Sequence, residues 1–369
     1  MTLKPAQTNI DEKKCRVHYK HFISTSDHVC GFCVHCTQKT KCMKKLIFMI
    51  MAMTMTGTIN AQIPEGYEVA TWQGFKKAAI TYSFDDGTPN QIPVAVPLLD
   101  KYGFHGTFNL IADWIKDWEE WKKVADSGHE IASHTVTHQR ISMLSAEQQI
   151  EELSKSKAII EEKIGHECVT MVYPYCARGN DSIVADYYIS ARSCSGQIGD
   201  KSPENFFDIT SKVVGTESDM RTAQDFSNWI VEATKTQGWC IFLIHAIDND
   251  GGYSSIESTE FEKHLQYVKC SEQIFWVGTF AEITKYIIER NSLTITETPN
   301  TAHIDISVRT NAESKLTKFD VPVTVKRKMP DNCTTAIVSC NGQEIETRIE
   351  DGCLIFDVVP GEDYTLNEM

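Results

Sequence analysis

The chain has 369 residues, more than one ordinary domain requires, and 41% of them are hydrophobic while 23% are charged. It can therefore bury a large core, and disorder is not expected. The 50 acidic residues outweigh the 36 basic ones, and the basic residues form only short pairs, so the net charge of -14 argues against a nucleic-acid surface.

The first recognisable element is an export signal. A basic start at Met43 is followed by the apolar run 46–53 and then by Ala61, a small residue at a suitable cleavage point. The run is too short to span a bilayer. We predict a signal peptide at 43–61, a misassigned extension at 1–42, and a secreted or periplasmic protein without a transmembrane anchor.

Metal binding offers an alternative account of the upstream stretch. Its cysteines and histidines could ligate zinc, although no second well-spaced pair accompanies Cys30, Cys33 and Cys36. Export would also permit disulfides among the eight cysteines after residue 61, but the sequence does not pair them.

Short apolar runs alternate with helical patterns from about residue 71 to residue 291. The predicted strands are 78–84, 106–111, 130–134, 168–173, 207–213, 239–245 and 275–278. The predicted helices are 145–164, 222–235, 257–268 and 280–289. About seven strand–helix units predict an α/β fold, an irregular (β/α) barrel with a mostly parallel sheet, as a catalytic domain at 62–291.

The best defined helix is 145–164. Ser145 and Gln148 form a capping box at its start, and Gly165 follows its end. Its predicted buried face holds four apolar residues, Ile150, Leu153, Ile160 and Ile164.

Two adjacent carboxylates, Asp85 and Asp86, follow the first predicted strand. With Gly87 they have the composition of a turn, at a strand end where barrel-like folds place chemistry. Adjacent carboxylates repel each other, so this is either a solvated turn or a site at which one of them holds a cation.

His134 and His138 follow the strand 130–134. Because they are four residues apart, a tight loop or a helical turn can direct both imidazoles to one side. Two imidazoles and one carboxylate are a common ligand set for a catalytic divalent metal. Either motif alone is often structural, but together at two strand ends they predict a metal site.

His245 ends the apolar run 239–245, and an exposed loop follows it. A lone histidine after a strand is more often structural. At this boundary it could also donate a proton to a leaving group.

With these residues in order, the chain resembles the polysaccharide deacetylase family (NodB homology, carbohydrate esterase family 4) over roughly residues 75–290. Ser83-Phe84-Asp85-Asp86 resembles the family's first motif. The segment 134–138 resembles its second motif, and Leu243-Ile244-His245 resembles its last.

The resemblance implies a metal-dependent hydrolase that removes acetyl groups from a carbohydrate, acting on carbon–nitrogen bonds other than peptide bonds, or on esters. It implies that the metal, usually zinc in this family, is held by Asp86, His134 and His138. Asp85 would be the general base that takes a proton from the attacking water, and His245 the general acid.

The family's third motif, an Arg-Pro-Tyr-Gly-like turn, supplies a backbone N–H for the oxyanion. Here the corresponding residues are Tyr173-Pro174-Tyr175-Cys176, and the resemblance implies Tyr175 as the donor. Cys176 stands where glycine is usual, and the arginine that steadies the base is absent from its place.

Other residues could replace these missing parts. Arg178 or Arg192 could take the place of the arginine from a neighbouring position. The fourth motif, an Asp/Trp pair that tunes the acid histidine, has no clean match, and Asp208 is a guess for its carboxylate.

The pattern changes after residue 291. Val321, Val323 and Val325 alternate with polar residues, no helical period appears, and turn signals such as Asn341-Gly342 separate the runs. We predict a small all-β sandwich domain at 292–369, with either a spacer or a carbohydrate-binding role.

The leading prediction is an exported polysaccharide deacetylase whose partner is an acetylated carbohydrate. The sequence does not separate N-acetyl from O-acetyl substrates, so an acetylxylan-type esterase is one alternative. A non-catalytic carbohydrate-binding protein on the same fold is the other. Retention of Asp85 and His245 favours an enzyme, because a binding protein needs no base. The oligomeric state is not predicted.

Overall fold

The computed structural model describes residues 62–331 and 333–368, which belong to one compact unit. The predicted extension, the signal peptide and the upstream cysteines lie outside these residues. Within the described ranges, no helix combines the length and the apolar character that a membrane crossing requires.

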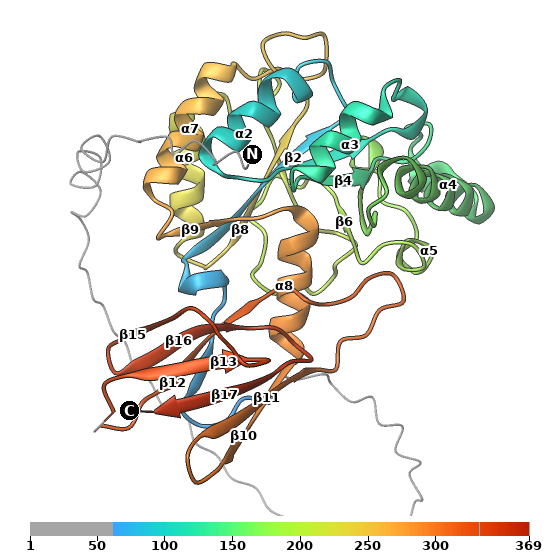
Figure 1. The fold of residues 1–369 in the computed structure, drawn as a ribbon. Helices are drawn as coiled ribbons and strands as arrows, with labels where there is room; N and C mark the ends of the chain where they lie inside the picture. The colour runs from blue at the N-terminus through green and yellow to red at the C-terminus, as the bar shows by residue number, and fades with distance from the viewer. Residues whose placement is uncertain (1–61, 332, 369) are drawn as a thin grey trace, which may run out of the picture. The chain divides into compact units, whose positions relative to one another are not determined.

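An eight-stranded parallel sheet forms the α/β part of the fold (Figure 1). Seven strands follow the order β6-β5-β4-β3-β2-β8-β7, and β9 also pairs with β2. The bounds are β2 Ala78–Asp85, β3 Thr107–Leu110, β4 Glu130–Ser133, β5 Thr170–Val172, β6 Ser190–Arg192, β7 Lys212–Val213, β8 Trp239–Ile244 and β9 Phe275–Val277. A parallel bridge between Arg192 and Ile209, near β7, draws the two ends of the sheet together. The predicted irregular barrel is confirmed.

Helices of this part connect the parallel strands (Figure 1). Their bounds are α2 Val96–Tyr102, α3 Trp118–Asp126, α4 Ala146–Ile164, α5 Asp181–Ala185, α6 Ala223–Ala233, α7 Ser258–Cys270 and α8 Phe280–Ser292. Short 3-10 or π turns lie between them at η2 Gln73–Phe75, η3 Gln91–Ala95, η4 Ala112–Trp114, η5 Ile141–Met143 and η6 Pro174–Cys176. The helices α4, α6 and α8 each begin with a capping box, which fixes where they start.

The predicted apolar face of α4 is wrong at one position. Ile150 is 42% exposed, whereas the other three predicted residues are buried. The buried face instead includes polar side chains such as Gln149, Ser156 and Glu152. These are satisfied locally, since Ser156 Oγ lies 2.8 Å from Ser133 Oγ and Gln149 accepts from the Asn180 N–H.

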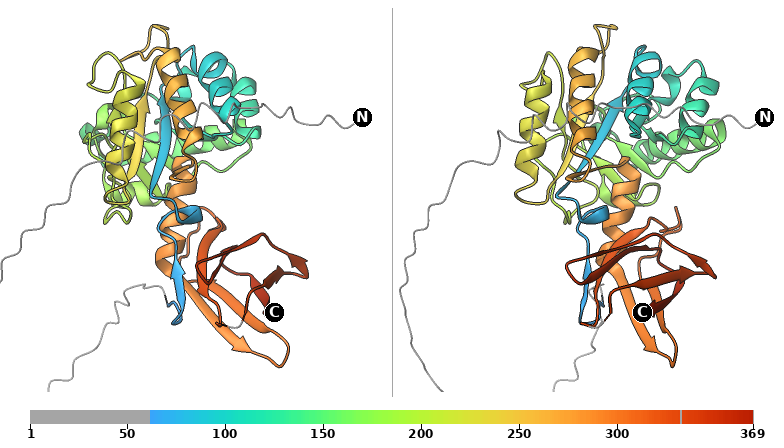
Figure 2. Two further views of the ribbon diagram at one scale, coloured as in Figure 1. Left: turned by 90° about the vertical axis from the view of Figure 1, so that its left-hand side faces the viewer. Right: turned by 60° about the vertical axis from the view of Figure 1, so that its left-hand side comes forward.

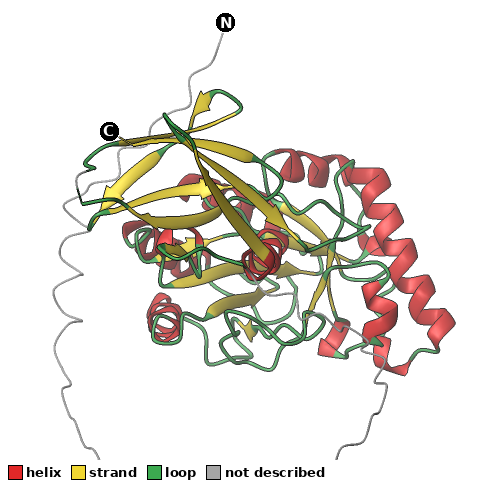
Figure 3. Cartoon of the chain, turned by 90° about the horizontal axis from the view of Figure 1, so that it is seen from below, coloured by secondary structure: helices red, strands yellow, loops and turns green. Residues whose placement is uncertain are grey.

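Two antiparallel sheets form the rest of the described chain, and after α8 it contains strands and loops only (Figure 3). One sheet has the order β1-β12-β16-β15 and the other β10-β11-β17-β13-β14. The bounds are β1 Tyr67–Val69, β10 Leu293–Pro299, β11 Ile304–Thr310, β12 Val323–Lys328, β13 Ala336–Cys340, β14 Gln343–Glu344, β15 Thr347–Glu350, β16 Cys353–Val358 and β17 Asp363–Glu368. Buried side chains of both sheets share one apolar cluster, as a sandwich requires.

One strand of this β part comes from the opposite end of the described chain. β1 pairs with β12 in register Val69 to Val325, and Figure 2 shows the blue β1 segment beside the orange and red strands. The apolar cluster also includes Trp72, Trp239 and Tyr286 from the α/β part. α8 ends at Ser292 and β10 begins with the next residue, so the predicted domain boundary at 291 has no linker and stays a prediction.

Candidate active site

The predicted site residues gather at the carboxyl ends of neighbouring parallel strands. Asp85 is the last residue of β2, His134 follows β4, and His245 follows β8. β2 pairs directly with β8 and, through β3, is connected to β4. Carboxyl ends of parallel strands meet at one edge of a sheet, which explains why residues so far apart in sequence come together.

Asp86, His134 and His138 form the candidate metal site. One ligand atom from each lies within 4.8 Å of the others. Asp86 Oδ1 is 3.4 Å from His134 Nε2 and 3.6 Å from His138 Nε2. The same oxygen is buried and has no hydrogen-bond partner. A buried acceptor without a donor is costly unless something else, such as a cation, interacts with it.

Protonation of the site also suits a cation. His134 Nδ1 lies 2.9 Å from the Val172 carbonyl oxygen, so Nδ1 carries the proton and Nε2 presents its lone pair. That lone pair faces His138 Nε2 at 3.2 Å. Burial, and then His134, lower the pKa of His138 to about 4, so it is neutral at pH 7. Two nitrogen lone pairs and an orphaned carboxylate oxygen therefore fit a divalent metal.

Asp86 reaches this position through an unusual backbone conformation. Its φ is +73°, and that of Gly87 is +67°. Aspartate tolerates the left-handed region better than most residues, and the turn directs its side chain away from the strand direction. Burial raises the pKa of the Asp86 carboxyl, but the nearby imidazoles, His134 first, outweigh burial and hold the pKa below its ordinary value.

The loop between the two histidines is held by Glu152 of α4. Its carboxylate accepts from the N–H groups of Val136 at 2.9 Å and Thr137 at 3.0 Å, and from the Thr137 hydroxyl. These bonds are charge-assisted because the acceptor is a carboxylate. Glu152 is 7% exposed, so solvent screens them little. Glu152 was not predicted as a site residue, although an acid on the buried face of a helix is a signal for such a role.

Asp85 points to a different set of partners. It is 3% exposed, and its Oδ1 accepts from Asn109 Nδ2 at 2.8 Å. Arg192 Nη2 donates to both of its oxygens, at 2.6 and 2.5 Å. Asp85 Oδ2 lies 3.9 Å from His134 Nε2, so the carboxylate is beside the metal site but outside the ligand set.

Arg192, of the two arginines considered, therefore takes the place of the missing third-motif arginine. Arg178 instead pairs with Asp181 at 3.0 Å and with Asp208 at 2.7 Å. Asp208 also accepts from Ser193, at 2.7 Å, so the guess that it tunes His245 is wrong.

His245 is fixed at its backbone rather than at its ring. Its carbonyl accepts from Thr88 Oγ1 at 2.9 Å and Gln91 Nε2 at 3.2 Å. Its Nδ1 is buried, and no group of the described chain hydrogen-bonds it. Burial lowers the pKa of His245, against the opposing effects of Asp85 and Asp86.

Exposed aromatic rings border the site. Tyr175 and Trp114 are 56% and 53% exposed, with ring centroids 4.6 and 5.3 Å from that of His138. Tyr253, 53% exposed, lies 5.1 Å from His245. Tyr175 has a φ of +55°, and the predicted roles of its N–H, of Asp85 and of His245 stay predictions.

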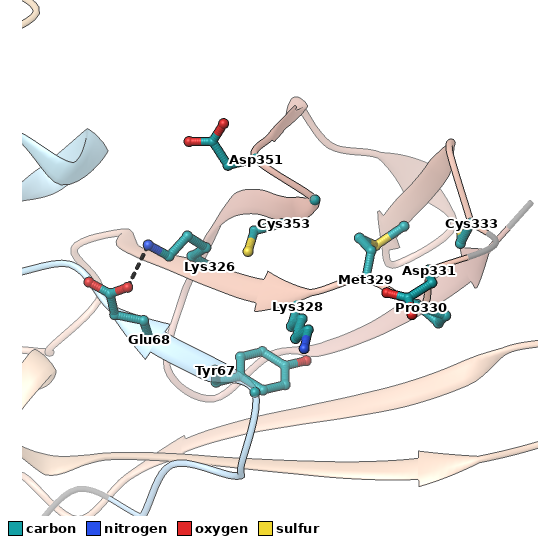
Figure 4. A pocket seen from close by; sticks show the side chains of 12 residues that line it. Tyr67, Glu68, Lys326, Lys328, Met329, Pro330, Asp331, Cys333, Asp351 and Cys353 are labelled. Atoms are coloured by element: carbon teal, nitrogen blue, oxygen red, sulfur yellow. Dashed lines mark ion pairs between the residues drawn. The ribbon is translucent and has the colours of Figure 1, made fainter.

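A cavity in the β part of the fold does not coincide with this site. This cavity has a volume of about 550 Å³, and Figure 4 shows Tyr67, Lys326 and Cys353 at its wall. Its Lys326–Glu68 ion pair is 2.5 Å long. None of the predicted site residues lines it, so the chemistry of the side chains, and not volume, marks the candidate active site.

Comparisons with known proteins identify a matching family model and several relatives of this chain. A model of the family described as polysaccharide deacetylase matches residues 73–188, which include the metal triad, Asp85 and Tyr175. A gellan lyase of a Bacillus species is 29% identical over 288 residues, 72% of this chain and 11% of that protein. YxkH of Bacillus subtilis, named as a candidate polysaccharide deacetylase, is 30% identical over 100 residues, 26% of this chain and 36% of that protein.

These alignments cover only a minor part of either curated relative. Among solved structures, a candidate polysaccharide deacetylase from Mycobacterium smegmatis is 16% identical, with a TM-score of 0.48, and covers 66% of this chain and 99% of that one. The predicted resemblance to the polysaccharide deacetylase family is therefore confirmed over residues 73–188.

Proposed function

We propose that the protein is a metal-dependent deacetylase that hydrolyses acetyl groups on a carbohydrate. The observation that carries this proposal is the separation of two adjacent carboxylates. Asp86 Oδ1 faces two imidazole nitrogens at 3.4 and 3.6 Å, while Asp85 is held apart by Arg192. A binding protein would need the first arrangement but not the second.

Each residue then has a chemical role. Asp86, His134 and His138 would hold a divalent cation, which we propose to be zinc, and when bound it would supply a Lewis acid for the attacking water and the acetyl carbonyl. Asp85 accepts the proton of the attacking water. The Tyr175 N–H donates to the developing oxyanion. His245 returns a proton to the departing amine or alcohol. It follows β8, which lies on the other side of β2 from the strand that precedes the histidine pair.

The residues at the rim of the site favour a carbohydrate as the substrate. Three exposed aromatic rings, those of Trp114, Tyr175 and Tyr253, border the histidines. Such rings offer flat apolar faces next to polar groups, which suits the mixed surface of a sugar ring. Export is also part of the proposal, and the Cys176–Cys194 disulfide supports an oxidising compartment.

Non-catalytic carbohydrate binding is the second candidate. The buried His245 Nδ1 has no hydrogen-bond partner among the described residues, so no carboxylate orients this ring through Nδ1. Because burial lowers the pKa of His245, little of it is protonated near pH 7. This matters less for an ester, whose alcohol is a better leaving group than an amine. Hydrolysis of O-acetyl esters is therefore the variant of the enzyme proposal that this observation favours.

Acetate release tests these proposals together. The full chain, supplied with zinc, is assayed on N-acetylglucosamine oligosaccharides and on O-acetylated xylan. We expect release that a chelator abolishes and added zinc restores, and the responding substrate identifies the bond. No release from either substrate, with metal bound stoichiometrically, would support the binding protein instead.

A further inference from the structure

Two departures from the third motif meet in one disulfide. Cys176 replaces the usual glycine, and Cys194 lies two residues after Arg192, which replaces the usual arginine. Their Cα atoms are 5.7 Å apart. We propose that the Cys176–Cys194 disulfide is a positioning clamp for the active site, and that catalysis requires its oxidised form. The inference rests on the deacetylase proposal and concerns the same site.

The clamp closes the end of the β5–β6 strand pair. Val172 pairs with Arg192 as the last partners of these strands, and the Tyr173 N–H donates to the Arg192 carbonyl at 3.1 Å. The Val172 carbonyl also orients His134. Beyond this point both segments leave the sheet. The disulfide is thus the covalent link that follows the last hydrogen bond between the strands.

One end of the clamp fixes the residue that holds the base. The Arg192 side chain is 1% exposed and contacts both oxygens of Asp85. Its Nη1 donates to Ser211 Oγ at 3.0 Å, and the Ser211 hydroxyl donates to the Ser193 carbonyl at 2.6 Å. β6 contains only three residues, which pair with β5 on one side and bond to Phe206 and Ile209 on the other. The crosslink at Cys194 adds a covalent tether just beyond the end of this short strand.

The other end fixes the turn beside the metal triad. Tyr175 and Cys176 both have a φ of +55°, a region that glycine adopts freely and that residues with a Cβ avoid. The Tyr175 ring contacts the His138 ring, and the Arg140 guanidinium carbon lies 4.4 Å from the Tyr175 ring centroid. A crosslink at Cys176 holds the chain in a conformation that the side chain alone disfavours.

Reduction should therefore release both arms together. With a water-soluble phosphine, the S–S bond breaks, phosphorus is oxidised to the phosphine oxide with oxygen from water, and the two sulfurs take up the two protons. Arg192 then holds Asp85 less firmly, and the turn that carries the Tyr175 N–H relaxes. Loss of such supporting contacts typically lowers activity or metal affinity by about 10-fold to 100-fold.

The experiment compares two double variants of the full chain with the wild type. Cys176→Ala/Cys194→Ala removes the clamp, and Cys176→Gly/Cys194→Ala removes it while restoring the glycine that favours the turn. We expect kcat to fall by about 10-fold to 100-fold in both, with KM changed less, and the cobalt affinity to fall. Phosphine, with metal kept in excess, should lower the wild-type kcat reversibly and leave both variants unaffected.

Several outcomes would overturn the proposal. If both variants keep the kcat and the cobalt affinity of the wild type, the disulfide contributes only to stability, and its loss would change Tm alone. Suppose that Cys176→Gly/Cys194→Ala keeps the wild-type kcat while Cys176→Ala/Cys194→Ala does not. The crosslink would then only hold the turn at Cys176 in its strained conformation and would not position Arg192. If phosphine lowers the kcat of the variants as much as that of the wild type, the effect of the phosphine does not come from this disulfide. Cys340→Ser is the control for unspecific effects at other cysteines.

Failure of the deacetylase proposal is distinguishable from failure of the clamp. If the oxidised wild type releases no acetate, the proposed function fails, and the cobalt titration alone judges the clamp. Weaker cobalt binding in both double variants would then support it, because the crosslinked segment contacts His138 through Tyr175 and His134 through Val172. Unchanged binding would contradict it.

Discussion

At the scale of single residues, the two neighbouring carboxylates owe their different environments to the backbone between them. Asp85 still belongs to β2 and meets Arg192 and Asn109, whereas Asp86 lies in a left-handed turn and meets the histidines. These different environments suit the proposed roles of Asp85 as base and Asp86 as metal ligand.

Asp85→Asn should therefore separate catalysis from metal binding. The variant keeps a side chain of the same shape but cannot accept the proton of the attacking water, so kcat should fall by about 100-fold to 10,000-fold. Metal affinity, measured by cobalt titration, should change little, because Asp85 lies outside the triad. Asp86→Asn is the matched control and should lose metal affinity. Wild-type turnover by Asp85→Asn would contradict the assignment of the base.

Glu152→Gln should weaken the metal site from a distance. Its carboxylate accepts two backbone N–H bonds from the loop between the ligand histidines, and loss of its charge weakens these bonds. We expect metal affinity to fall by about 10-fold. The exposed neighbour Glu151, which pairs with Lys155, offers the control Glu151→Gln. Equal metal affinities of Glu152→Gln and Glu151→Gln would show that Glu152 does not support the metal site.

The sequence predicted the ligands better than their supports. The spacing of His134 and His138 is local, and the Asp-Asp-Gly turn is a recognisable pattern, so the triad could be found without coordinates. Arg192 was only one of two possibilities, because its contact with Asp85 depends on the pairing of β6 across the sheet. Asn109 and Glu152 escaped because their partners are set by tertiary packing alone.

At the scale of elements, strong local signals predicted helices and long strands, and weak ones failed. The capping box of α4 fixed its first residue, and the apolar run of β8 fixed that strand. β6 is Ser-Ala-Arg, with no apolar run or alternation, so it was missed. The predicted strand 207–213 shrank to β7, two residues long, since only Lys212 and Val213 pair with β8.

α8 carries a buried acid that should make stability depend on pH. Glu289 is fully buried, its Oε1 accepts from the Val321 N–H at 3.0 Å, and its Oε2 has no partner in the described chain. Burial raises the pKa of Glu289 to about 8, with Asp320 raising it further and Lys285 opposing. In the unfolded chain the pKa is about 4.3.

The sign of the effect follows from proton uptake. Between pH 4.3 and pH 8, roughly, the folded protein keeps a proton that the unfolded chain releases, so the free energy of unfolding falls as pH rises, by about 1.4 kcal/mol per unit. Glu289→Gln removes this loss, so its Tm relative to the wild type should rise from pH 5 to pH 8. The exposed Glu313→Gln is the control. A Tm difference independent of pH would show that Glu289 ionises normally.

At the scale of the whole molecule, the α/β part and the β part share one apolar cluster. Phe280, Ile283 and Tyr286 of α8 belong to the same cluster as Val323 and Val325 of β12. β1 adds a strand from before the barrel to the sheet that contains β12. A boundary in the sequence pattern near residue 291 is therefore not a boundary in packing, and pattern alone could not reveal this, because a change of periodicity says nothing about which faces touch.

Removal of the chain after Ser292 should consequently destabilise the barrel. Each large apolar side chain that loses its burial forfeits about 1.5–3 kcal/mol, and several in α8 would be exposed together. We expect the full chain to unfold in a single thermal transition, and the truncated chain to show a lower Tm and exposed apolar surface in a dye-binding assay.

The control for this truncation is a substitution on the surface of the β part that leaves the rest of the chain intact. Ile349→Ala removes a 42% exposed side chain of β15 and should leave Tm and dye binding unchanged. Two separate transitions in the full chain, or a truncated chain with the wild-type Tm, would establish independent domains. In that case the shared cluster would contribute little to stability, and the β part would be free to serve as a spacer. A single transition would instead make the β part a structural component of the catalytic fold.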